Sequence, residues 1–160
     1  MSKSENYFPK ILRVKQEKSK YAFLMEIIPA LAAVIAISSI IVSNCNVSRS
    51  LELQSEQKAM EIYEKYDLMA KESQDFTDTI FASKPENWTA KYVAFAKKAL
   101  FYSESIFILR RDSQPWLSTV ELSLLLPHLT FYKKNNFLDE TFNEDFKKFV
   151  ERLYKRYKVY

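Results

Sequence analysis

A stretch of 21 residues without a charged side chain, Ile27–Val47, constrains this chain more than any other feature of its sequence. Its first part, Ile27–Val42, is apolar apart from Ser38 and Ser39. A helix rises about 1.5 Å per residue, so the stretch is long enough to cross the hydrocarbon core of a bilayer, which is about 30 Å thick. We therefore predict a transmembrane anchor over residues 21–46.

Three other structures are compatible with such a stretch. A buried helix of a soluble protein needs partners on all its sides, whereas the later segments of this chain are amphipathic. A cleaved signal peptide has a small-residue cleavage site after its apolar core, and none follows here. A lipidated cysteine is the third, because Val42–Cys45 resembles a bacterial lipobox, but Asn44 stands where that motif carries a small residue. We rank the uncleaved anchor above all three.

The basic residues around the stretch predict its orientation. Residues 1–20 form a basic segment with six Lys and Arg side chains against two acidic ones, whereas only Arg49 and Lys58 follow the stretch closely. Flanks rich in Lys and Arg stay in the cytoplasm, where they also meet anionic membrane lipid. We expect a single-pass protein of the bacterial inner membrane, with a cytoplasmic N-terminus and residues 47–160 forming a helical periplasmic domain. In a eukaryote that domain would face a lumen.

The composition excludes several classes of functional site. The sequence contains no glycine, one cysteine and one histidine. Phosphate-binding loops, dinucleotide-binding turns and nucleophile elbows need glycine where the backbone takes a positive φ or approaches a ligand closely. One cysteine and one histidine provide neither an internal disulfide nor a zinc site. We therefore expect no cofactor and no metal.

The charge is concentrated at the N-terminus. Residues 1–20 carry the whole formal net charge of +4, because residues 51–160 hold 17 basic and 17 acidic side chains. A basic stretch near the C-terminus, Lys147–Lys158, matches the polarity expected at the end of a helix. We therefore expect no nucleic-acid partner.

Apolar residues recur at helical intervals through the rest of the chain, which predicts an all-α fold. The prediction is one N-terminal transmembrane helix followed by a small bundle of about four helices. The first bundle helix continues from the span as a stalk after Ser50. A second follows a capping box at Ser83–Glu86, and the last follows another at Thr141–Glu144.

A dense apolar segment, Trp116–Leu126, predicts the third helix of the bundle. Pro127 should kink or end it, because proline lacks the backbone N–H that continues a helix. We expect Leu122 and Leu124–Leu126 to be buried, because so dense an apolar run is unfavourable in water.

Two features of the span favour contact with a second chain. Small residues recur at steps of four, three and four on one face of the predicted helix: Ala32, Ala36, Ser39 and Ser43. Such a stripe lets membrane helices approach closely, which favours a homo-oligomer or a partner span; otherwise the stripe faces lipid. Cys45 emerges in an oxidising compartment, either as a free thiol or in an intermolecular disulfide.

The small-residue stripe gives a testable expectation. Replacing both Ala36 and Ser39 with leucine should weaken self-association, because the added bulk keeps two helices apart. A membrane two-hybrid assay measures the effect, and an unchanged signal would remove this interface.

His128 is the side chain that most suggests catalysis, as a general base with Glu121 or Asp112. The sequence assembles no such constellation, however. Paired carboxylates at Asp139–Glu140 and Glu144–Asp145 stand where a helix start favours acidic residues. We therefore expect no catalytic residue.

The leading hypothesis is a single-pass membrane-anchored helical protein that binds a protein partner on the non-cytoplasmic side. Its role would be non-catalytic: inhibition, immunity or assembly. One alternative is a transmembrane sensor or assembly subunit that signals through the stalk after Ser50. The other is an enzyme that uses His128 with a nearby carboxylate.

Overall fold

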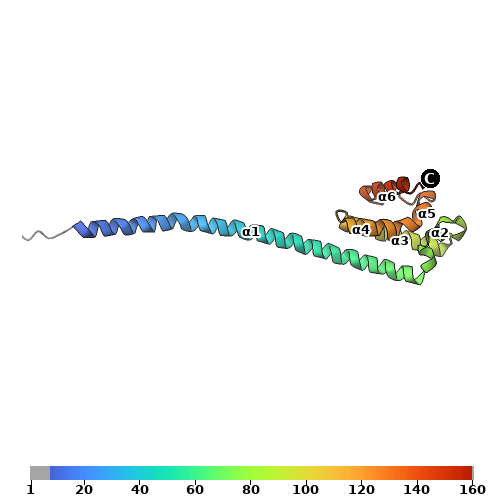
Figure 1. The fold of residues 1–160 in the computed structure, drawn as a ribbon, viewed down its shortest axis with the longest axis horizontal. Coiled ribbons are helices and arrows are strands. Elements are labelled where there is room, and N and C mark those ends of the chain that lie inside the picture. Colours follow the sequence, from blue (N-terminus) through green and yellow to red (C-terminus); the bar gives the residue numbers. More distant parts are fainter. Residues whose placement is uncertain (1–7, 160) are drawn as a thin grey trace, which may run out of the picture. The chain divides into compact units, whose positions relative to one another are not determined.

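The computed structural model describes residues 8–159, with side chains for Met25 and for residues 27–159. Over this range the chain consists of helices and helical turns without a strand, which confirms the predicted all-α fold (Figure 1). The chain divides into two units, with the boundary between Ser50 and Leu51.

Helix α1 comprises Phe8–Glu72 and carries the apolar stretch in the first unit. Every side chain from Ile28 to Ser50 is exposed. By length and composition, this is a helix that can cross a membrane, as predicted. Pro29 lies in the helix interior rather than in its first turn, because the helix already begins at Phe8. The backbone bond that Pro29 cannot form is the one to the carbonyl of Met25.

The second unit is a helical bundle that includes the last turns of α1. Ala59 and Tyr66 of α1 are buried in its core, and Ile62 and Met69 pack against it. The other elements follow in chain order (Figure 1): the 3-10 turn η1 (Gln74–Thr77), α2 (Thr79–Ser83), the 3-10 turn η2 (Pro85–Asn87), α3 (Ala90–Arg110), α4 (Gln114–Thr119), the π-helix η3 (Val120–Leu125), the 3-10 turn η4 (Leu126–His128), α5 (Leu129–Lys134) and α6 (Glu144–Arg156).

Helix α3 is the central element of the bundle, because it contacts α4, η3 and α6. Its buried side chains recur at helical intervals, as the sequence predicts, and include Tyr92, Phe95, Ala99 and Ile106. Helix α2 packs against η4 and α5. The core therefore lies on one face of α3, which leaves the opposite face of this helix in contact with solvent.

Two helices begin a few residues from the predicted capping boxes. The residues Ser83–Glu86 lead into η2, and α3 begins after Thr89, whose hydroxyl accepts a backbone N–H of the first turn. Helix α6 begins after Asn143, whose side-chain oxygen accepts two backbone N–H groups, while Thr141 bonds to Asp139 instead. Several side chains before each helix can serve as caps, so the local sequence permits more than one start.

Pro127 changes the form of the third helical segment without ending it. In an α-helix the carbonyl of Ser123 would accept the N–H of residue 127, which proline lacks. The segment becomes a π-helix and then a 3-10 turn at this point, and continues into α5. The hydroxyl of Tyr66 donates to the Ser123 carbonyl oxygen at 2.7 Å. A side chain of α1 thus satisfies the acceptor that Pro127 leaves without an α-helical donor.

The prediction that Leu122 is buried is wrong. Leu122 is 55% exposed, whereas Leu124 and Leu125 are buried. The wider turn of η3, closed by bonds between residues five apart, shifts the phase of the helix within this apolar run. One leucine of the run therefore faces solvent.

We expect Tyr66→Phe to lower the free energy of unfolding by about 1–3 kcal/mol, because a partly buried carbonyl loses its donor while the ring remains. Denaturant unfolding of the full chain in detergent micelles measures the change. Tyr63→Phe is the matched control, since among the described residues the Tyr63 hydroxyl forms no hydrogen bond and its loss should cost under about 0.5 kcal/mol. Equal effects of the two substitutions would contradict the role assigned to the Tyr66 hydroxyl.

Candidate functional site

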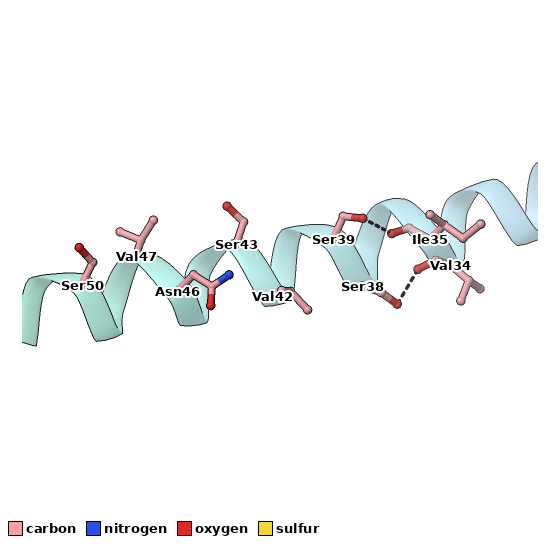
Figure 2. A pocket seen from close by; sticks show the side chains of 9 residues that line it. All are labelled: Val34, Ile35, Ser38, Ser39, Val42, Ser43, Asn46, Val47 and Ser50. Atoms are coloured by element: carbon pink, nitrogen blue, oxygen red, sulfur yellow. Dashed lines mark hydrogen bonds between the residues drawn. The ribbon is translucent and has the colours of Figure 1, made fainter.

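An exposed face of α1 that includes Ser39 and Ser43 of the predicted stripe forms a shallow hollow, shown in Figure 2. It is lined by nine side chains between Val34 and Ser50, all from this one helix, so it is not an enclosed cavity. The hydroxyls of Ser38 and Ser39 donate to the carbonyl oxygens of Val34 and Ile35, both at 2.8 Å. These two serines satisfy their hydroxyls within their own helix, which suits an apolar environment.

The four residues of the predicted packing stripe, Ala32, Ala36, Ser39 and Ser43, are all exposed. Ser39 and Ser43 project from the same side of α1 in Figure 2. Cys45 is exposed and free. Helix packing through the stripe and an intermolecular disulfide at Cys45 stay predictions. Lys3 of the basic segment lies outside the described residues, as do the side chains of the other basic residues before Tyr21.

His128 lies at the end of η4 and is fully buried. Its Nδ1 is 3.0 Å from the hydroxyl oxygen of Tyr92. The rings of Phe95 and Tyr132 pack against the imidazole, with centroids 5.5 and 5.8 Å away. We place the proton on Nε2, so that Nδ1 accepts the Tyr92 hydroxyl hydrogen, because the other tautomer leaves that buried hydroxyl without an acceptor.

Burial determines the ionisation of His128. Removing the imidazole from water penalises its charged form and lowers the pKa of His128 to about 3. The side chain is therefore neutral at physiological pH. Its Nε2 has no hydrogen-bond partner among the described residues, which suits a ring held in an aromatic environment more than a proton-transfer relay.

The carboxylates predicted as partners of His128 are engaged elsewhere. Glu121 accepts hydrogen bonds from Arg156 Nη1 at 2.6 Å and from the Tyr157 hydroxyl at 2.8 Å. Asp112 lines a separate groove. A general base must reach a proton on a bound molecule, and the aromatic rings around His128 close that access. The described residues also contain no group of three or more His, Cys, Asp or Glu side chains able to hold a metal ion.

A charged groove of about 430 Å³ lies where the end of α3, α4, η3 and α6 meet. Its apolar lining comes from Phe107, Leu117, Phe149 and Leu153. Its polar lining contains four basic and three acidic side chains together with Gln114: Arg111, Lys148, Arg152, Arg156, Asp112, Glu121 and Asp145. We call this site the α6 groove.

The basic side chains of the α6 groove are unequally paired. Glu121 is largely buried and binds Arg156 closely. The oxygens of Asp145 lie 3.9 Å from Arg111 Nη1 and 3.8 Å from Lys148 Nζ, beyond ordinary hydrogen-bond length. Arg152 lies over the ring of Phe149, 5.8 Å from its centroid, and forms no ion pair among the described residues. These last three basic groups therefore keep their hydrogen-bond donors available.

A polar cluster joins α1 to the end of α3. Glu56 accepts Trp116 Nε1 at 3.0 Å and pairs with Arg110 Nη2 at 2.8 Å, and Arg110 Nη1 donates to Ser55 at 3.1 Å. The sequence does not reveal this cluster, because its members are more than 50 residues apart and fit no short-range pattern. The α6 groove also escapes sequence reasoning, because it combines residues around the end of α3 with residues of α6, although the basic residues at the end of α6 hint at part of it.

The described residues thus present an exposed apolar helix face, a closed histidine and a charged groove. Neither the histidine nor the groove assembles a nucleophile, a base and an oxyanion site of the kind that acyl transfer needs. No protein-family model matches the chain, and no curated protein or solved structure matches it either.

Proposed function

We propose that this chain is a membrane-anchored protein whose helical bundle binds a protein partner on the non-cytoplasmic side, without catalysis. The observation that carries the proposal is the exposure of every side chain from Ile28 to Val47 on α1. Burying apolar surface is favourable by about 25 cal/mol per Å², so an apolar surface of this size favours a cover, and none of the described residues provides one. Membrane lipid is the cover that fits its length.

The charge distribution supports the proposed orientation. The six basic side chains within residues 1–20 favour a cytoplasmic N-terminus. The bundle from Leu51 onward then lies on the other side of the membrane. For a bacterial protein this is the periplasm, where inhibition, immunity or assembly would be the role of such a bundle.

The surface of the bundle supports partner binding. Phe101 and Ile108, which are seven residues apart on α3, are 55% and 53% exposed. Exposed aromatic and arginine side chains dominate the energetics of protein interfaces, and both occur on this bundle. The closure of His128 by aromatic rings supports a role in which no proton is transferred.

Topology in bacterial cells tests the anchoring half of this proposal. We expect alkaline phosphatase fused after Tyr160 to be active, and a fluorescent protein fused at the same place to be dark. Phosphatase fused after Lys20 is the control and should be inactive, because it follows only the basic segment. Fluorescence without phosphatase activity at Tyr160 would place the bundle in the cytoplasm and contradict the proposal.

Photo-crosslinking tests the binding half. A crosslinking amino acid at the exposed position Phe101 should yield a discrete adduct with an envelope protein in living cells. The same amino acid at Ile80, which is exposed on α2, is the control for nonspecific capture. Identical products from both positions, or none from either, would contradict a partner at the α3 surface.

A second candidate function is signalling through α1, and the polar cluster at Glu56 favours it. Arg110 and Trp116 both bind Glu56, so a displacement of this part of α1 would be passed to α3 and α4. A Trp88→Phe variant leaves Trp116 as the one tryptophan. If α1 signals, the fluorescence of Trp116 should shift when this variant is compared in vesicles whose bilayers differ in thickness. Constant emission would leave the anchored binding protein as the better description.

A further inference from the structure

We infer that the α6 groove is where the partner of the proposed function docks, and that the docked segment is an acidic peptide with apolar side chains between its carboxylates. This inference rests on the proposed function and adds the site and the chemistry of the partner. It follows from the groove's loosely paired basic groups, its aromatic floor and the distribution of charge over the bundle.

The basic groups on the rim of the groove can accept carboxylates from outside. Asp145 holds Arg111 and Lys148 only at 3.9 and 3.8 Å, whereas a charge-assisted hydrogen bond is about 2.7–2.9 Å long. An incoming carboxylate can therefore form shorter bonds with these groups than the chain itself provides. Arg152 has no carboxylate partner among the described residues. Arg111 directly follows α3, and the other two groups belong to α6, so the three can hold a segment that runs along the groove.

Glu121 does not oppose an acidic ligand, although it lines the same groove. Its carboxylate accepts bonds from both Arg156 and Tyr157, and the positive charge of Arg156 offsets its negative charge. Once this pair is set aside, three basic side chains remain in the groove against Asp112 and Asp145. The excess of one positive charge at the groove is small, but its surroundings add to it.

The bundle has no net charge, but its acidic and basic residues are unevenly distributed along the sequence. Residues 51–78 hold three basic and eight acidic side chains, a net charge of −5, whereas residues 79–160 hold 14 basic and nine acidic side chains, a net charge of +5. The α6 groove is built wholly from the positive part. Such a field attracts acidic partners from a distance and raises their association rate.

The floor of the groove explains why the segment should also carry apolar side chains. Phe107 and Phe149 lie with ring centroids 5.2 Å apart, and Leu117 and Leu153 extend this surface. Arg152 is held over Phe149, which positions its guanidinium for an incoming group. Arginine beside buried aromatic rings, surrounded by a polar rim, is the usual anatomy of an interface hot spot.

An anionic lipid surface fits the groove less well than a peptide. A membrane surface responds to the sum of many basic residues, whereas Asp112 and Asp145 interrupt the basic rim here. The apolar floor lies below that rim, where a flat layer of headgroups makes no contact. A peptide can place its carboxylates against the basic groups and its apolar side chains between them.

A pair of designed peptides tests this inference. The full chain is placed in nanodiscs of phosphatidylcholine, and two fluorescein-labelled helical peptides are compared by fluorescence anisotropy. They share one pattern of leucines and carry glutamate or lysine at every polar position. We expect the glutamate peptide to bind and the lysine peptide not to bind, with affinity that falls as salt is added.

Matched charge reversals locate the binding. Arg152→Glu and Arg111→Glu should each weaken binding of the glutamate peptide at least about tenfold, as expected when a close charge pair becomes a repulsive one. Lys84→Glu makes the same charge change at an exposed position outside the groove and should alter binding less than about twofold. Arg152→Lys keeps the charge and should retain most of the affinity. Equal losses in all three glutamate variants, or equal binding of both peptides, would overturn the groove as the site.

Two further outcomes would assign the groove to another occupant and overturn the inference. In the first, the glutamate peptide fails to bind, whereas the nanodisc-held chain binds phosphatidylglycerol vesicles and Arg152→Glu abolishes this vesicle binding. The second is a dimer in detergent that Arg152→Glu dissociates, which would identify a second copy of the chain. Photo-crosslinking separates failure of the groove from failure of the function. A partner captured from Phe101 but not from position 152 would leave the proposed function standing without this site.

Discussion

Replacing Phe146 with alanine should lower the free energy of unfolding of the bundle by about 3–5 kcal/mol, the range expected for truncating a buried phenylalanine. Phe146 has no exposed surface. Its ring packs against Phe107 of α3 and Phe142 before α6, with centroids 5.5 and 6.2 Å away. The alanine variant would lose these contacts and leave a cavity between α3 and α6. Because single domains are stable by only about 5–15 kcal/mol, this loss would bring the bundle near its unfolding threshold.

Tryptophan fluorescence in a urea series measures this effect on the full chain in detergent micelles. Trp88 and Trp116 both lie in the bundle, so their signal reports its unfolding and not that of the apolar stretch. Phe101→Ala is the matched control, since it removes the same side chain from an exposed position where its one ring contact among the described residues is with Phe142. That control should cost about 1 kcal/mol or less. Similar losses for the two variants would contradict the packing of α6 on α3.

The second large effect is a loss of stability in acid caused by His128. Its pKa is about 3 in the folded chain because the imidazole is buried, against 6.5 for an unperturbed histidine. Between these values the unfolded chain binds a proton that the folded chain excludes, so stability falls as the pH drops below 6.5. The loss reaches about 2 kcal/mol at pH 5 and about 3 kcal/mol at pH 4, at 1.36 kcal/mol for each unit of difference. Stability above pH 6.5 does not depend on this group.

A variant without the titrating ring isolates this contribution. His128→Gln keeps a side-chain acceptor for the Tyr92 hydroxyl but does not titrate between pH 4 and 7. Because the carboxylates are the same in both proteins, the difference between their unfolding free energies should change by about 2 kcal/mol from pH 7 to pH 5. The groups facing His128 from α3 and α5 are Tyr92, Phe95 and Tyr132, and none of them titrates in this range. If the unfolding free energies of the two proteins changed with pH in parallel, protonation of His128 would not destabilise the folded chain, and the prediction would be contradicted.

Features that depend on periodicity could be predicted from the sequence. The apolar stretch of α1, the buried face of α3 and the buried Phe146, Phe149 and Leu153 of α6 all follow from helical spacing. The acidic start and basic end of α6 also follow, because the helix dipole favours them. Each of these patterns lies within one segment, so it can be recognised without knowing how that segment packs against others.

Features that depend on distant segments could not be predicted. The exposure of Leu122 results from a π-helix beside Pro127. The α6 groove and the cluster at Glu56 combine residues from helices far apart in sequence. His128 was identified as isolated from any fixed constellation, but its enclosure by Tyr92 and Phe95 depends on how α3 packs against η4. The spacing of apolar residues in the sequence does not predict these contacts, because they depend on how the helices pack in three dimensions.

The bond from Tyr66 to Ser123 has a consequence for synthesis of the chain in the cell. Its two residues are separated by 57 positions, and the cluster at Glu56 spans a similar length. Ribosomes make the α1 partner first, so its apolar face, with Ile62 and Met69, must wait exposed until the residues around Ser123 have been added. Elongation at about 5–20 residues per second makes this wait several seconds long. During that interval this apolar face has no packing partner within the bundle, so the nascent chain is exposed to aggregation at this stage of synthesis.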